Sequence, residues 1–124
     1  MIASLRTWLW PDGADLLARP RLTRSRWLEV VYAIGDVHGC LDQLRRLESL
    51  IVADACAYAG DKLIVMLGDY IDRGSNSAGV LDHLLSDPPI DFARVCLAGN
   101  YEKMMTDFIK QPRVCPNGCR CGFT

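Results

Sequence analysis

Three short motifs contain the residues whose types and spacing could do chemistry. They read Gly35-Asp36-Val37-His38-Gly39, Gly68-Asp69-Tyr70-Ile71-Asp72-Arg73-Gly74 and Gly99-Asn100-Tyr101-Glu102. A carboxylate beside an imidazole suits manganese, iron, zinc or cobalt, and is a poor donor set for calcium. A nearby guanidinium can hold two phosphoryl oxygens and stays charged at any working pH. The motifs therefore predict a metal site that acts on a phosphorylated group.

Each candidate ligand has a chemical reason and an alternative interpretation. Asp36 and His38 lie two positions apart, so in extended chain their side chains point to the same side. Asp69 offers two oxygens and can bridge two metal ions. Asn100 offers a neutral amide oxygen, or it caps the helix that follows. Arg73 binds phosphate, or it forms a surface ion pair of little energetic value.

The spacing of the motifs favours one joint site over separate turns. Asp36, Asp69 and Asn100 are 33 and 31 positions apart, close to the length of a βαβ unit, roughly 30 residues. Each motif also follows an apolar run. Because open α/β sheets bind ligands at the carboxyl ends of their strands, we expect the three motifs at neighbouring strand tips.

The apolar pattern predicts the elements that position these motifs. Continuous apolar runs over 30–34, 63–67 and 92–98 indicate parallel strands covered on both faces. Apolar residues at three- and four-residue steps indicate helices over 41–51, 80–85 and 104–109, each with one face in the core. The predicted order is β-α-β-α-β-α, an α/β fold with parallel strands and right-handed connections.

Composition limits the class of protein. The chain has 124 residues and a net charge of -1, so one domain is expected and no nucleic-acid partner. No apolar run approaches the roughly 20 residues that span a bilayer, and no secretory signal is recognisable. We therefore expect a cytoplasmic protein without a membrane partner.

The two ends of the chain lack the periodicity of the middle. Residues 1–27 contain five arginines against two aspartates and read as a basic irregular arm. Residues 112–124 form a degenerate Cys-rich tail, in which Cys115, Cys119 and Cys121 match no paired zinc pattern. Residues 28–111, which show the apolar periodicity, are predicted to form the folded domain.

The three motifs resemble those of the phosphoprotein phosphatase family of the calcineurin-like metallophosphoesterases, whose pattern is GDxHG, GDxxDRG and GNHE. The resemblance covers residues 30 to about 110. GDYIDRG is similar to the serine/threonine protein phosphatases, and GDVHGCLDQL is similar to bacterial members, including symmetrical dinucleoside tetraphosphatases. The resemblance implies the N-terminal half of a four-layer αββα sandwich, a partial domain. The loss of pattern in the tail suggests a truncated or frameshifted product.

The resemblance also implies a ligand set. Asp36 and His38 would bind the first of two divalent metal ions, Asp69 would bridge, and Asn100 would bind the second. Manganese would be the main metal, with iron or zinc as alternatives. In this family further histidines come from the later half of the domain, so only the first metal site looks complete. His83, the only other histidine, is expected to be a surface or packing residue.

The implied reaction is hydrolysis by a metal-bound hydroxide that attacks phosphorus in line. Arg73 would grip the phosphoryl oxygens and Asp72 would orient the general acid through a hydrogen bond. The family's general acid is the histidine of GNHE, and this chain has Tyr101 there. A phenol ordinarily titrates near 10 and is a poorly matched acid at pH 7.

These features leave one leading interpretation and two alternatives. The leading one is a serine/threonine-type metallophosphatase with reduced activity, acting on a phosphoprotein or a phosphorylated small molecule. The first alternative is a non-catalytic pseudophosphatase that binds a phosphorylated ligand. The second is a symmetrical dinucleoside tetraphosphatase.

Overall fold

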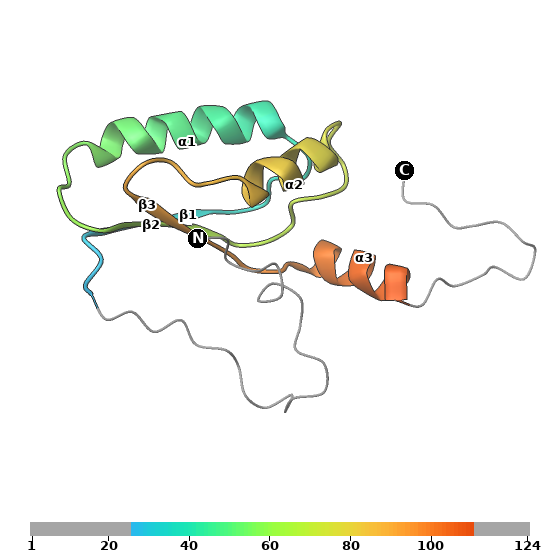
Figure 1. Ribbon diagram of the computed structural model, residues 1–124. Helices are drawn as coiled ribbons and strands as arrows, with labels where there is room; N and C mark the ends of the chain where they lie inside the picture. Colours follow the sequence, from blue (N-terminus) through green and yellow to red (C-terminus); the bar gives the residue numbers. More distant parts are fainter. Residues whose placement is uncertain (1–25, 111–124) are drawn as a thin grey trace, which may run out of the picture.

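The computed structural model describes residues 26–110 as a parallel three-stranded sheet with three helices (Figure 1). The order is β1 (Val30–Ile34), α1 (Leu41–Ala55), β2 (Lys62–Met66), α2 (Ser77–Leu85), β3 (Phe92–Cys96) and α3 (Asn100–Lys110). The predicted α/β class and β-α-β-α-β-α order are confirmed. None of the described helices has the length and apolar character needed to cross a membrane. Nearly all of the expected arm, and all of the expected Cys-rich tail, lie outside the described residues.

The sheet brings the three motif-bearing loops to one edge. β2 lies between β1 and β3, and both pairings are parallel. Met66, the last residue of β2, is paired with Ile34 on one side and with Cys96 on the other. The three strands therefore end level with one another, and the loops that follow them start side by side.

The core lies between the sheet and the two helices that cover one of its faces, α1 and α2 (Figure 1). Ile64, Met66 and Val80 are fully removed from solvent, and each such side chain contributes about 1.5–3 kcal/mol. Asn76 caps the N-terminus of α2 by accepting a hydrogen bond from the Gly79 N–H at 2.9 Å.

Two expectations about burial are wrong for the described residues. Cover on both faces of the sheet was expected, but Val31 of β1 is 52% exposed. A core face was expected on the third helix, but α3 has no buried residue, and Met104 and Ile109 are exposed. The reason is placement, because α3 runs away from the carboxyl end of the sheet (Figure 1). Its early residues Tyr101 and Met105 still pack partly against the core.

A buried ionic cluster joins α1, α2 and β3. Glu48 of α1 is 5% exposed, and its carboxylate oxygens lie 2.8 Å from Arg94 Nη2 and 2.6 Å from His83 Nε2. Arg94 also donates to the carbonyl oxygens of His83, Leu84 and Ser86 at the end of α2. His83 thus lies largely buried against the carboxylate of Glu48, outside the motif-bearing loops.

Candidate metal centre

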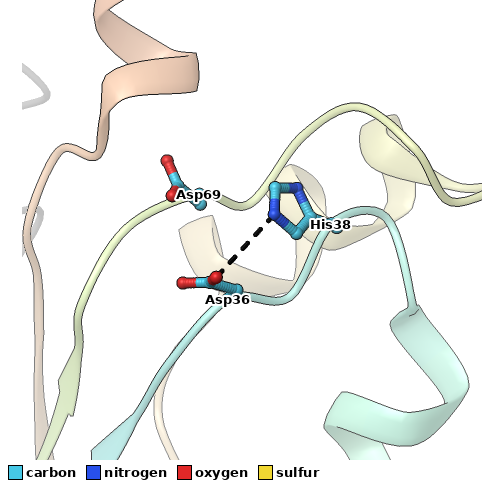
Figure 2. A group of neighbouring side chains, drawn as sticks. All are labelled: Asp36, His38 and Asp69. Carbon is cyan, nitrogen blue, oxygen red and sulfur yellow. Dashed lines mark ion pairs between the residues drawn. The ribbon is translucent and has the colours of Figure 1, made fainter.

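The side chains of Asp36, His38 and Asp69 point toward one another at the carboxyl edge of the sheet (Figure 2). Asp36 and His38 belong to the loop between β1 and α1, and Asp69 belongs to the loop after β2. Each offers one ligand atom, and the three atoms lie within 4.8 Å of one another. Two carboxylates and an imidazole form a donor set suited to Mn²⁺, Fe²⁺ or Zn²⁺.

The imidazole of His38 is oriented as a metal ligand. Its Nδ1 lies 3.0 Å from the carbonyl oxygen of Ile71. Because a carbonyl oxygen only accepts, we assign the ring hydrogen to Nδ1, and the lone pair of Nε2 then faces Asp36 at 4.0 Å. Ligand histidines in metal sites are usually held in this way. The His38 side chain is 15% exposed and that of Asp36 is 70% exposed, so the group is open on one side.

Backbone hydrogen bonds lock the first two loops together. The carbonyl oxygen of Asp69 accepts from the N–H groups of Val37 and His38 at 3.0 and 2.9 Å. The N–H of Gly39 donates to the carbonyl oxygen of Tyr70 at 2.8 Å. The loops also touch at Gly74, where a Cβ would collide with the carbonyl oxygen of His38. The close approach requires glycine, which explains that position of the motif.

Left-handed backbone is concentrated at this group. Among the described non-glycine residues, five have positive φ, and four of these are His38 (44°), Asp69 (56°), Asp72 (69°) and Arg73 (69°). Such conformations cost about 1–2 kcal/mol for an L-residue and cluster at functional sites. The core and the loop hydrogen bonds must hold these residues against that cost.

The start of α3 completes the group from the third strand tip. The amide nitrogen of Asn100, in the orientation that satisfies both groups, lies 3.1 and 3.2 Å from the two carboxylate oxygens of Asp69. The N–H of Tyr101 donates to Asp69 Oδ1 at 3.2 Å. The structure thus brings the four sequence-predicted ligands Asp36, His38, Asp69 and Asn100 to one place.

Glu102 is a residue of the site to which sequence reasoning gave no role. Its carboxylate accepts from the N–H groups of Asp69 at 2.8 Å, Tyr70 at 2.6 Å and Gly99 at 2.8 Å. It therefore ties the loop after β2 to the loop after β3. Its place in the first turn of α3, next to the predicted ligand Asn100, was the available signal.

Arg73 and Tyr101 meet beside the metal ligands. The Tyr101 hydroxyl accepts from Arg73 Nε at 3.0 Å and Nη2 at 2.6 Å. The Tyr101 ring also packs edge-on against the His38 ring, with centroids 4.9 Å apart. Within the described residues the hydroxyl makes no hydrogen bond to Asp72, whose N–H donates instead to Ser77 Oγ at 3.0 Å.

Comparison with known proteins identifies the family of this chain. The model of the calcineurin-like phosphoesterase family matches residues 30–119. The chain belongs to this family. The family resemblance predicted from the three motifs is thereby confirmed, and so is membership of a family of hydrolases.

Individual members of this phosphoesterase family match only part of the chain. Serine/threonine-protein phosphatase 1 of Salmonella typhimurium is 35% identical over 89 residues, which is 70% of this chain and 36% of that protein. A symmetrical bis(5'-nucleosyl)-tetraphosphatase of Ectopseudomonas mendocina is 38% identical over 72 residues, covering 58% of this chain and 24% of that protein. The chain thus spans about a third or less of these relatives' length. No solved structure matches the chain closely.

The residues present fit the metal chemistry of a calcineurin-like phosphoesterase. The donor set is of the right type, His38 is held with Nε2 toward the other ligands, and strained backbone is concentrated at the ligands. Arg73, an exposed cation, is linked to this group through Tyr101, whose ring packs against His38. The arrangement is therefore a candidate site for divalent cations.

Proposed function

We propose that this site hydrolyses phosphoric esters with the help of divalent metal ions, as a serine/threonine-type phosphatase does. The observation that carries the proposal is the convergence of Asp36, His38 and Asp69, with ligand atoms within 4.8 Å of one another. In this proposal Asp36 and His38 would hold one ion, Asp69 would be shared by both, and Asn100 would hold the second. When bound, such ions polarise a phosphoryl oxygen and lower the pKa of a water molecule.

The chain's own side chains supply binding and orientation. Arg73 binds the phosphoryl oxygens, because its guanidinium is exposed and matches two oxygens at once. Asp72 and Tyr101 complete the proposed catalytic residues. Manganese is our proposed metal, since a mixed carboxylate and imidazole set suits it. A cytoplasmic location stays a prediction from the sequence.

The proposed substrate is a phosphoprotein, which the relative named serine/threonine-protein phosphatase 1 supports. A second candidate is symmetrical cleavage of a dinucleoside tetraphosphate, favoured by the relatives named for that activity. A third is binding of a phosphorylated ligand without turnover, favoured by Tyr101, whose hydroxyl is already paired with Arg73.

The test is hydrolysis of p-nitrophenyl phosphate by the full chain, with Mn²⁺ and with chelator. We expect turnover only with Mn²⁺, reduced at least a hundredfold in Asp69→Asn and unchanged in Asp82→Asn, an equal charge change on the exposed side of α2. A phosphoserine peptide and a dinucleoside tetraphosphate then separate the first two candidates. Mn²⁺ binding without turnover of any of them supports the third, and absence of Mn²⁺ binding overturns all three.

A further inference from the structure

Tyr101 is held at the metal centre by contacts with three of its residues. Its N–H donates to Asp69 Oδ1, its ring packs edge-on against His38, and its hydroxyl accepts from Arg73. The side chain comes from α3, yet it is anchored to both loops of the first two motifs. These contacts with the site residues therefore fix the position of the Tyr101 side chain.

The hydrogen-bonding capacity of this contact is only partly used. A phenol oxygen has two acceptor lone pairs and one O–H. Because Arg73 Nε and Nη2 fill the two lone pairs of Tyr101, the O–H is the group left to donate to a ligand. A guanidinium has five N–H bonds, and the two given to Tyr101 leave three for other acceptors. The pair therefore offers several donors and one positive charge beside the metal ligands.

This array fits an oxyanion with several oxygens, such as a phosphoryl group. We propose that Tyr101 is an oxyanion-binding residue of the site, whose O–H donates to a phosphoryl oxygen beside the remaining N–H groups of Arg73. This inference rests on the proposed function and names a further residue that binds its phosphoryl group.

The test measures binding. Tyr101→Phe removes the hydroxyl and keeps the ring against His38. Tyr32→Phe is the matched control, because it removes a hydroxyl that lies 2.6 Å from Asp54 Oδ2, away from the metal centre. We expect all three proteins to bind Mn²⁺ within about twofold of one another, measured as loss of the free Mn²⁺ resonance. Inorganic phosphate should bind about tenfold more weakly to Mn²⁺-loaded Tyr101→Phe only, as expected for one hydrogen bond to a charged oxygen.

Equal phosphate affinity in wild type and Tyr101→Phe overturns the inference while leaving the proposed function standing. Failure of the wild type to bind Mn²⁺ is the different result that overturns the proposed function.

Discussion

The part of the fold from β1 to α2 and the part from β3 to α3 contribute to the same site in different ways. The first part holds the fully buried side chains Ile64, Met66 and Val80, whereas β3 is only partly buried and α3 has no buried residue. Asp36, His38 and Asp69 come from the first part. The groups from α3 are joined to them mainly by hydrogen bonds, through Asp69, Glu102 and Arg73. The comparison teaches that packing positions one half of this site and polar contacts position the other.

The largest expected effect tests the packing half. Ile64→Ala should lower the free energy of unfolding by about 2–5 kcal/mol, because it leaves a cavity in a side-chain position with 0% exposure. Met105→Ala on α3 should cost less than about 1 kcal/mol, since that side chain is only partly buried. Urea unfolding followed by circular dichroism measures both. Equal losses in the free energy of unfolding would show that packing stabilises the two parts to the same extent.

The next effect concerns the buried ionic cluster that bridges the two parts. Glu48→Gln should cost about 3 kcal/mol, because it leaves the buried charge of Arg94 without its carboxylate. The control is Asp107→Asn, which breaks an exposed pair with Lys103 and should change stability by no more than about 0.5 kcal/mol. The same urea experiment applies. A loss in Glu48→Gln as small as in the control would mean that the cluster is not what joins α1, α2 and β3.

The sequence predicted the features of the fold and of the site that depend on local motifs and apolar periodicity. The strand tips, the element order and the convergence of Asp36, His38, Asp69 and Asn100 followed from motif spacing and the geometry of parallel sheets. Glu48 could not be placed, because its partners His83 and Arg94 lie 35 and 46 positions away and act only in the folded chain. The apolar stripe of the third helix was predicted to face the core. Periodicity shows which side of a helix is apolar, but it does not show which surface packs against that side.

The third effect tests the polar half. Glu102→Gln should weaken Mn²⁺ binding about tenfold, about 1.4 kcal/mol, because the amide replaces an oxygen that accepts backbone N–H bonds near Asp69. Calorimetry with Mn²⁺ measures the affinity, and circular dichroism checks that the sheet persists. Glu48→Gln is the contrasting control. It should reduce the stability of the protein, but at a temperature where the variant is folded it should bind Mn²⁺ with wild-type affinity. Unchanged Mn²⁺ affinity in Glu102→Gln would show that the first two loops position Asp69 without help from Glu102.

The smallest effect lies where the two parts meet, at Cys96 and Tyr70. Burial raises the pKa of the Cys96 thiol from 9.0 to about 11, and burial also raises the pKa of Tyr70, whose hydroxyl donates to the carbonyl oxygen of Leu97 at 2.5 Å.

Below about pH 9 the Cys96 thiol is protonated in both the folded and the unfolded state. Its full contribution to the free energy of unfolding is therefore present. Between about pH 9 and 11 the unfolded chain releases the proton that the folded chain keeps, so stability falls as pH rises. Because Cys96 is only partly buried, we expect about 1 kcal/mol or less from it. Unfolding free energies at pH 8.5 and 10.5 should fall less in Cys96→Ala than in wild type. An equal fall would show that the end of β3 is open to water in the folded protein.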